Sequence, residues 1–392
     1  MNSPQQYKPI ACIGIRIRHF ETSDISGIGD ISDVDARCRA ILDRLDALDL
    51  HPHVIAETGQ DTLGPFFQIR LSDAQAQAWA PGLDTLQLCQ TLQLDTQNRP
   101  ADLLREIVLG LLMGPLAFDY PSLDELLSAI NIRRNIVLAG RKTSLAFGTA
   151  EADRPERFWT YDEDEGFVIL PGVSLIAALI HATQPDVSGH RYAFSCYRAT
   201  EYVILLGIAQ ELAQCNPSLY QQLQDFWTER TISSGQFHDV FLHELGSMEQ
   251  PLPPHYFVPG SRTWFRNPDE ASADASGFEG SWVMYLGGGL FTNFWTCDQP
   301  YTLVRKCVEI YHWRHGIYLD EDGEPRIDES KIAPMIEATM RDPAELQKVM
   351  AVMERYREAR GMYTDAGGCI DTTREFARWV CPGTSNLLLP SK

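Results

Sequence analysis

The stretch Tyr192-Ala-Phe-Ser-Cys196-Tyr-Arg-Ala-Thr200-Glu lies directly before an apolar-periodic run from Tyr202 to Cys215. The length and the spacing of this run are typical of an α-helix, so we expect Cys196 near a helix N-terminus. A thiol at that position lies beside the positive end of the helix dipole and beside unpaired backbone N–H groups, and both favour the thiolate. The stretch therefore predicts a cysteine nucleophile. The alternative interpretation is a buried core cysteine at the start of a helix.

Composition and charge narrow the class of protein. The chain has 392 residues, of which 44% are hydrophobic and 22% are charged, values that are typical of a globular protein with two or three domains. Its uninterrupted apolar runs are too short to cross a bilayer. The net charge is −20 without a basic stripe, which disfavours nucleic acid and acidic membrane surfaces as partners.

The nine cysteines are scattered along the chain, and none of them forms a Cys-x-x-Cys pair. An odd number of cysteines in a large protein indicates reduced thiols, and with an N-terminus that lacks signal-peptide organisation we expect a cytoplasmic protein. Zinc-ligand spacing is missing. Gly287-Gly-Gly289 is not followed by a lysine or a helix, so it indicates a hairpin turn and not a phosphate site. The sequence predicts neither a metal nor a cofactor.

The pattern of apolar residues divides the chain into three regions. Residues 1–150 are predicted to be a mixed α/β region, residues 151–316 a second domain that contains the cysteine, and residues 317–392 a helical C-terminal extension. In the first region we expect strands over 10–18, 53–56 and 66–71, helices over 101–113 and 123–130, and a strand–turn–strand over 132–147. In the others we expect strands over 167–170, 258–266, 281–286 and 290–296, and helices over 174–181, 202–215, 301–312, 329–340, 343–360 and 372–380.

Several motifs in the middle region resemble one family, the small bacterial spore-coat protein-glutamine gamma-glutamyltransferases, or transglutaminases. The resemblance covers residues 155 to 315 and keeps the order of the family. Its most specific segment is Val258-Pro-Gly-Ser-Arg-Thr-Trp-Phe-Arg-Asn-Pro-Asp269. The other segments are Pro155-Glu-Arg-Phe-Trp159, Gly166-Phe-Val-Ile-Leu170, Tyr192–Thr200, Phe278-Glu-Gly-Ser-Trp-Val-Met-Tyr-Leu286 and Leu290-Phe-Thr-Asn-Phe294.

The resemblance implies an α+β fold with a papain-like core, preceded here by the N-terminal α/β region and followed by the helical extension. It also implies a chemistry in which the cysteine attacks a glutamine carboxamide, ammonia leaves, and an amine takes the acyl group from the thioester. Such covalent catalysis needs a group that accepts the thiol proton and a group that orients this acceptor.

The sequence departs from the family at the residues that would accept the thiol proton and orient its acceptor. The family has Gly-Glu-Asn where this chain has Gly280-Ser281-Trp282, and Gly-His-Gly where this chain has Asn293-Phe294-Trp295. The catalytic glutamate thus corresponds to Ser281 and the histidine to Phe294, so only Cys196 carries over.

Three replacements are conceivable. His238, with Asp239 beside it, lies where the family also has an aromatic–histidine pair, and His190 precedes the cysteine by six residues. Glu279 stands two positions before the expected glutamate, a shift that keeps the same face of a strand. The alternative for His238 is a residue that caps or lines a loop, and the alternative for Glu279 is a loop carboxylate that faces solvent. We take Cys196, His238 and Glu279 as the candidate catalytic residues.

These residues favour a transglutaminase-like cysteine acyltransferase that forms an amide or isopeptide bond. Its donor would be a protein glutamine or an acyl group on a carrier protein, and its acceptor an amine. A carrier thioester needs no protonation of a leaving amide, so the loss of the family histidine would matter less. The alternatives are an inactive binding module for a protein or peptide, with Ser281 and Phe294 in an apolar cleft, and a thiol hydrolase or deamidase.

Overall fold

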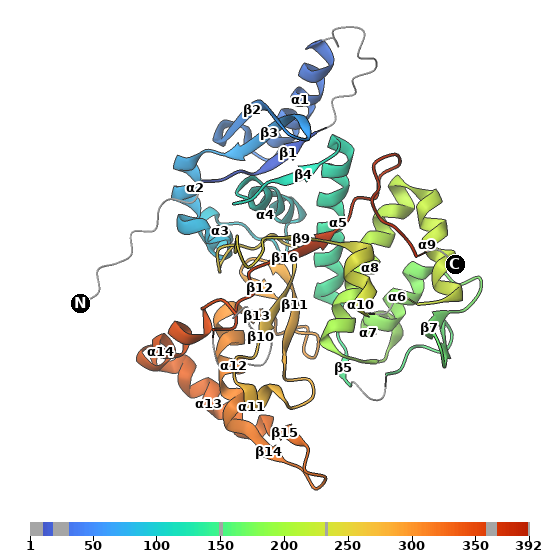
Figure 1. The fold of residues 1–392 in the computed structure, drawn as a ribbon, viewed down its shortest axis with the longest axis vertical. Helices are drawn as coiled ribbons and strands as arrows, with labels where there is room; N and C mark the ends of the chain where they lie inside the picture. Colours follow the sequence, from blue (N-terminus) through green and yellow to red (C-terminus); the bar gives the residue numbers. More distant parts are fainter. Residues whose placement is uncertain (1–10, 19–30, 149–151, 232–233, 358–366, 391–392) are drawn as a thin grey trace.

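The computed structural model describes residues 11–18, 31–148, 152–231, 234–357 and 367–390. Figure 1 shows a central sheet with an N-terminal lobe in blue, a helical lobe in green and a C-terminal lobe in orange and red around it. The predicted domain boundary between residues 150 and 151 lies outside the described residues, as does Ile10 at the start of the first predicted strand.

The N-terminal lobe is a four-stranded sheet with helices packed against it. Its strand order is β2-β3-β1-β4, and β1 pairs antiparallel with β3 and parallel with β4. The three predicted strands and the helix over 101–113 are confirmed as β1, β2, β3 and α4. The elements are β1 (Ile15–Ile17), α1 (Ile31–Asp46), β2 (Val54–Asp61), β3 (Gly64–Leu71), α2 (Asp73–Trp79), α3 (Leu88–Leu92), α4 (Pro100–Leu112) and β4 (Phe118–Tyr120), with short 3-10 turns at His51–His53, Pro81–Leu83 and Thr85–Gln87.

The helix α5 (Leu123–Lys142) is longer than the sequence suggested. Its N-terminus is capped by Ser122, whose hydroxyl accepts a hydrogen bond from Glu125 N at 3.1 Å. The predicted strand–turn–strand over 132–147 is wrong, because most of this segment continues the helix. Gly140 does not turn the chain; it lets the helix approach Leu286 and Thr292, which a Cβ would meet at 3.1 and 3.2 Å. Only β5 (Ala146–Phe147) is extended, and it pairs in parallel with β8 (Ala193–Phe194).

The central sheet has six strands in the order β13-β12-β11-β10-β16-β9, with antiparallel neighbours. The predicted helix over 372–380 is wrong, because its centre forms β16. Arg374 and Glu375 resemble the polar face of a helix, but both are buried and paired inside the sheet region. The strands are β9 (Leu242–Leu245), β10 (Arg262–Arg266), β11 (Gly280–Gly287), β12 (Leu290–Phe291), β13 (Tyr301–Thr302) and β16 (Arg374–Ala377).

Strand β11 shows how the sheet is covered on both faces. Successive side chains of a strand point to opposite faces. Met284 belongs to the apolar cluster of α8 (Cys196–Cys215), whereas Val283 and Tyr285 belong to the cluster of α12 (Leu303–Gly316). Helices α5 and α8 thus lie against one face and α12 against the other.

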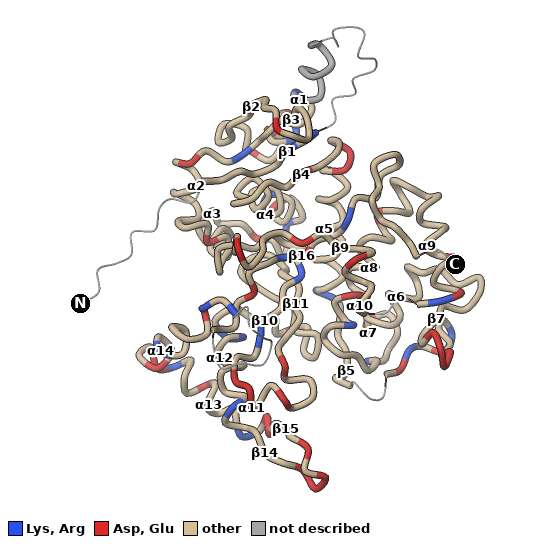
Figure 2. The backbone as a smooth tube through the Cα atoms, in the orientation of Figure 1, with Lys and Arg blue, Asp and Glu red and all other residues tan. Residues whose placement is uncertain are grey.

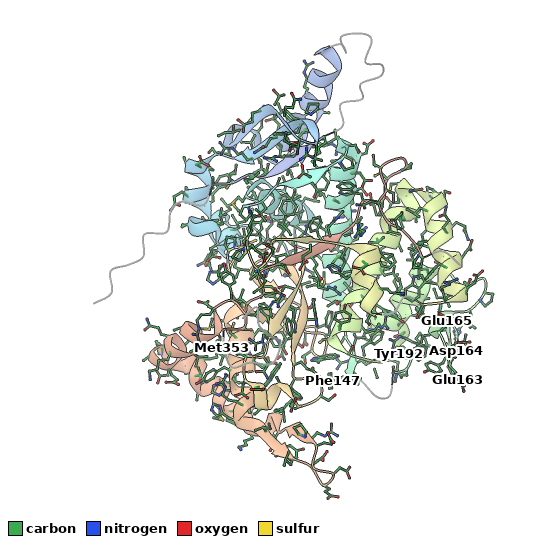
Figure 3. All side chains as sticks on the ribbon, in the orientation of Figure 1. Phe147, Glu163, Asp164, Glu165, Tyr192 and Met353 are labelled. Atoms are coloured by element: carbon green, nitrogen blue, oxygen red, sulfur yellow. The ribbon has the colours of Figure 1, made fainter. Side chains whose placement is uncertain are left out.

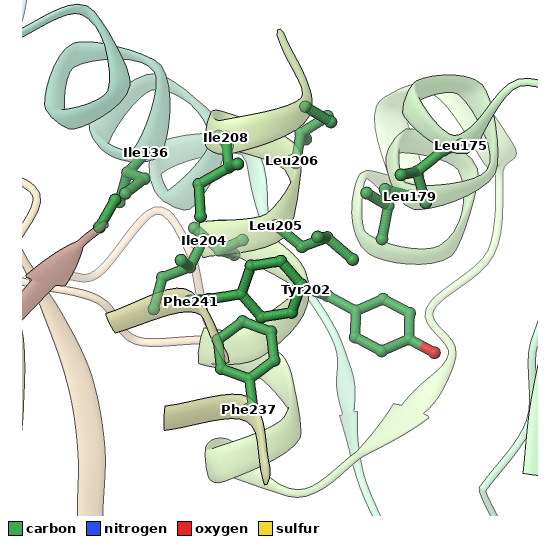
Figure 4. Close-up of a cluster of buried hydrophobic side chains, with 14 of the residues drawn as sticks. Ile136, Leu175, Leu179, Tyr202, Ile204, Leu205, Leu206, Ile208, Phe237 and Phe241 are labelled. Carbon is green, nitrogen blue, oxygen red and sulfur yellow. The ribbon is translucent and has the colours of Figure 1, made fainter. Parts of the chain in front are cut away.

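Helix α8 is the centre of the green lobe and is apolar on almost every side, as expected for a helix that is enclosed by other elements. Figure 4 shows five side chains of α8 among those of α5, α6 and α10: Tyr202, Ile204, Leu205, Leu206 and Ile208 lie among Ile136, Leu175, Leu179, Phe237 and Phe241. The surrounding elements are β6 (Trp159–Asp162), β7 (Gly166–Ile169), α6 (Leu175–Thr183), α7 (Pro185–Ser188), α9 (Pro217–Glu229) and α10 (Ser234–Phe241).

The C-terminal lobe is built on α12. The predicted helices over 329–340 and 343–360 are confirmed as α13 and α14, although α14 ends earlier, and a small hairpin precedes them. Helix α12 packs against α13 and α14, and β16 returns to the central sheet, so contacts cross the expected domain boundary at residue 317. This domain boundary stays a prediction. The remaining elements are α11 (Glu270–Ala273), β14 (Ile317–Leu319), β15 (Pro325–Ile327), α13 (Glu329–Arg341) and α14 (Pro343–Met353). The α+β class is confirmed.

The acidic excess of the chain is spread over the molecule. Figure 2 shows acidic and basic positions interspersed over all three lobes. One concentrated acidic group is the turn Glu163–Glu165 between β6 and β7, whose exposed side chains are labelled at the edge of the molecule in Figure 3. Within the described part of the chain, the helices are too short or too polar to cross a membrane.

The close approach of α5 and α8 depends on Gly207. A Cβ at this position would lie 2.6 Å from Ile136 Cγ1 and 3.1 Å from Ile136 N. We expect Gly207→Ala to lower the free energy of unfolding by about 1–3 kcal/mol, because overpacking outweighs the gain in helix propensity. Urea denaturation measures this change.

Gly235 in α10 is the matched control, since a Cβ there meets nothing within 4 Å. Gly235→Ala should leave stability unchanged or raise it by up to about 1 kcal/mol. Equal effects of the two substitutions would contradict the packing argument.

Candidate active site

Cys196 is the first residue of α8, so its predicted position at a helix N-terminus is confirmed. Strand β8 ends at Phe194, and Ser195 caps the helix by accepting a hydrogen bond from Arg198 N at 3.2 Å. Because the rest of α8 is held in the core, the position of the thiol is fixed by packing. Cys196 is half-buried and therefore keeps part of its surface open.

The surroundings of the thiol act on its pKa in both directions. Burial raises the pKa of Cys196, and the negative charge of Glu279 adds to this effect. The backbone N–H groups of Trp282 and Tyr197 and the positive charge of Lys306 lower it. Burial dominates, so the pKa of Cys196 lies above its ordinary value and the thiol predominates at neutral pH.

Lys306 is a cation whose charge lowers the pKa of the Cys196 thiol. This residue was not predicted from the sequence. It lies on α12 and is 3% exposed. Its Nζ is 3.2 Å from Glu309 Oε1 and 3.4 Å from the centroid of the Tyr301 ring. Although burial opposes the charge, Glu309 and Tyr301 keep the pKa of Lys306 above its usual value. The sequence did contain a signal for this residue: a lysine on the apolar face of a predicted helix, between Leu303, Cys307 and Ile310.

The candidate Glu279 lies in the electrostatic surroundings of Cys196, and its catalytic role stays a prediction. It is half-buried directly before β11, where its Oε1 accepts a hydrogen bond from Gly277 N at 3.3 Å and its backbone oxygen accepts one from Asn267 N at 3.0 Å. Its charge acts on the Cys196 thiol. The two candidates Cys196 and Glu279 therefore share one electrostatic environment.

His238 has another partner. It lies on α10, with its Nε2 atom 3.4 Å from Glu375 Oε1 of β16 and its Nδ1 atom 3.4 Å from Asp239 Oδ1. The structure thus brings the imidazole to a carboxylate and not to the sulfur. His190 is exposed, and its Nε2 atom lies 3.7 Å from Asp153 Oδ2. A role of His238 in proton transfer stays a prediction.

The two positions that depart from the family have different surroundings. Ser281 is half-buried and pairs with Phe265 across β10 and β11. Phe294 is 3% exposed and belongs to the apolar core around α8, and its backbone oxygen accepts a hydrogen bond from Leu145 N at 2.7 Å. Hydrocarbon therefore occupies the place where the resemblance implies an imidazole.

Arg262 of β10 contacts two aromatic rings near the Cys196 thiol. Its guanidinium lies 5.0 Å from the ring centroid of Tyr197 and 4.7 Å from that of Trp282, and it forms an ion pair with Glu375. The Trp282 ring also stacks on Trp264 at 6.0 Å. Gly280 permits this arrangement, because a Cβ there would overlap the indole of Trp264.

A polar cavity of about 400 Å³ adjoins Lys306 on the side of α12 and α13. Its lining includes Tyr301 and Glu309, the two partners of Lys306, together with Asn293, Arg305 and Trp313. The cavity therefore connects the protein surface with Tyr301 and Glu309, which hold the Lys306 ammonium in place. Among the described residues, no three His, Cys, Asp or Glu side chains gather in a way that could hold a metal ion.

The family model for protein-glutamine gamma-glutamyltransferase matches residues 84–368. The chain belongs to this family. The matched range is wider than residues 155–315, over which the motifs resemble it, and reaches into both flanking regions. A transglutaminase from Geobacillus stearothermophilus, without its C-terminal extension, is a similar solved structure, with 18% identity over 66% of this chain and 95% of that chain and a TM-score of 0.36. A comparison with curated proteins finds no match.

The opposing charges at the thiol of this family member can be tested separately. We expect Lys306→Met to raise the pKa of Cys196 and Glu279→Gln to lower it, because each change removes one charge from a poorly solvated site. The rate of iodoacetamide labelling at Cys196 against pH, followed by peptide mass spectrometry, measures both shifts.

Lys348→Met is the matched control, because Lys348 pairs with a carboxylate three residues away on the surface of α14, as Lys306 does in the core. It should leave the profile of Cys196 unchanged. Shifts of the same sign for Lys306→Met and Glu279→Gln would contradict the arrangement described above.

The buried Arg262–Glu375 pair joins β10 to β16. Glu375→Gln leaves the buried guanidinium without its counter-charge, so we expect a loss of about 3 kcal/mol of unfolding free energy. The double variant Arg262→Met/Glu375→Gln should recover part of this loss, since neither charge is then buried alone. Additive losses in the double-mutant cycle would mean that the two side chains do not interact.

Proposed function

We propose that this member of the protein-glutamine gamma-glutamyltransferase family is a cysteine acyltransferase that makes an amide bond through an acyl-thioester on Cys196. One observation carries the proposal: the thiol starts a buried helix, keeps an open side, and is acted on by two backbone N–H groups and the cation of Lys306. A papain-like core is part of the proposal, and the packing of α8 against an antiparallel sheet supports it.

In the first step the thiolate of Cys196 attacks the carbonyl carbon of the donor. The thiol proton goes to solvent base, and Lys306 with the N–H groups of Tyr197 and Trp282 stabilises the negative sulfur. The bond from the carbonyl to the leaving group then breaks, which leaves the acyl group on sulfur. Because the pKa of Cys196 is raised, this step becomes faster as the pH rises toward and above the ordinary thiol range.

The leaving group decides which donor is suitable. Ammonia can leave a glutamine carboxamide only with an added proton, and Phe294 cannot supply one. A thiolate leaves a thioester without this help. The buried, apolar surroundings of Phe294 therefore favour an acyl group on a carrier-protein thiol over protein glutamine.

In the second step an amine attacks the Cys196 thioester. The new C–N bond forms, the C–S bond breaks, and the sulfur leaves as a thiolate beside Lys306. The attacking amine loses a proton, and we assign its acceptance to Glu279, the carboxylate whose charge reaches the site. The proposed partners are thus a carrier-bound or protein acyl donor and an amine, and these steps need no part of His238.

Intact-mass measurement of the full chain tests the acyl-enzyme. After incubation with acyl-N-acetylcysteamine, a small surrogate of a carrier thioester, we expect one added acyl group, formed faster at pH 9 than at pH 7. A glutamine-containing peptide should label the protein at least about tenfold more slowly, because its leaving group needs a proton.

Cys196→Ala should abolish the adduct, whereas Cys297→Ala, which removes another half-buried thiol, should keep it. An adduct that persists in Cys196→Ala, or wild-type protein that stays unmodified at both pH values, would refute the proposal.

A binding module is the second candidate, and the raised pKa of Cys196 together with the apolar burial of Phe294 favours it. In that function the thiol is a packing residue and the site holds a peptide without chemistry. The two functions differ in the alkylation profile. A nucleophile gains reactivity as it ionises, whereas an enclosed structural thiol stays unreactive up to the pH of unfolding.

A further inference from the structure

An apolar cavity lies in the N-terminal lobe, between the sheet and three helices. It has a volume of about 280 Å³ and is open to solvent. Thirteen of its fifteen lining residues are apolar, and they come from β1, β3, α1 with the turn after it, α4 and α5. None of the residues assigned to the acyl-transfer chemistry lines it. The cavity is therefore separate from the proposed active site.

Two polar side chains interrupt the apolar lining. Arg44 of α1 lines the cavity and is exposed, so it stands where the cavity meets solvent. Within the described residues its guanidinium has no carboxylate partner. Asn131 of α5 is half-buried and donates a hydrogen bond from Nδ2 to Glu211 Oε1 at 3.3 Å. Arg44 thus places a positive charge at the entrance of an apolar cavity in a chain with a net charge of −20.

We propose that this cavity binds a single-chain carboxylic acid, with its hydrocarbon chain among α1, α4 and α5 and its carboxylate at Arg44. An apolar space with one charged group at its entrance matches an amphiphile with one charged end. A guanidinium is planar and forms two parallel hydrogen bonds with a carboxylate, which an uncharged head group cannot match.

The volume sets the length of the chain. An apolar cavity of about 150 Å³ takes up benzene, which has six carbons. The cavity of about 280 Å³ therefore accommodates about ten carbons. Burial of each pair of methylene groups should strengthen binding about tenfold until the cavity is full.

Isothermal titration of the full chain with saturated carboxylates of six to fourteen carbons tests the length. We expect the affinity to rise about tenfold for each two carbons and to level off near ten. Leu127→Trp, at a half-buried lining position, should reduce the affinity at least tenfold without a change in melting temperature. If the affinity still rises at fourteen carbons, or if Leu127→Trp leaves it unchanged, the carboxylates adsorb to the surface and the proposal is overturned.

The head group is tested with octanoate and 1-octanol. Arg44→Ala should weaken the binding of octanoate about fivefold to tenfold and leave the binding of 1-octanol unchanged. Arg39→Ala, which removes an exposed arginine of α1 that does not line the cavity, should affect neither ligand. Equal losses of octanoate and 1-octanol in Arg44→Ala would refute recognition of a carboxylate. Because the readout is binding alone, its failure is independent of acyl transfer at Cys196.

Discussion

The burial of α8 along nearly its whole length is the constraint on which the candidate site depends. A helix enclosed by α5, α6, α9, α10 and β11 cannot shift along its axis without opening the core. Its first residue, Cys196, is therefore presented at a fixed point between β11 and α12. The tight contact at Gly207 and the ring contacts of Arg262 fix the same helix from its middle and from its N-terminal end.

The electrostatics of the thiol differ from those of a cysteine that is activated by an imidazole. Desolvation works against the thiolate, and the compensation comes from backbone N–H groups and from a lysine that is itself buried. A fixed ammonium can stabilise a negative sulfur, but with its raised pKa it does not accept and return a proton near neutral pH. Such a site suits reactions whose leaving group is already a good anion.

The sequence predicted what local patterns determine and missed what distant contacts determine. Regular apolar spacing located α4, α13 and α14, and the cysteine at the start of α8 followed from the run after it. The strand β16 was missed because its Arg374 and Glu375 are polar, and only their partners in the folded protein explain their burial. Lys306 was missed for the same reason: Tyr301 and Glu309 are what make a buried ammonium tolerable. The second half of α5 was misjudged because the pair Ala139-Gly140 favours a turn until Leu286 and Thr292 pack against it.

The position of β16 has a consequence for the way the protein matures. Residues 374–377 fill the gap between β9 and β10 in the central sheet, although they follow β10 by more than 100 residues along the chain. Until they leave the ribosome, β10 lacks one neighbour and Arg262 lacks its counter-charge. The nascent chain therefore exposes an unpaired strand edge until residue 377 has been synthesised, and the central sheet is completed only from that point on.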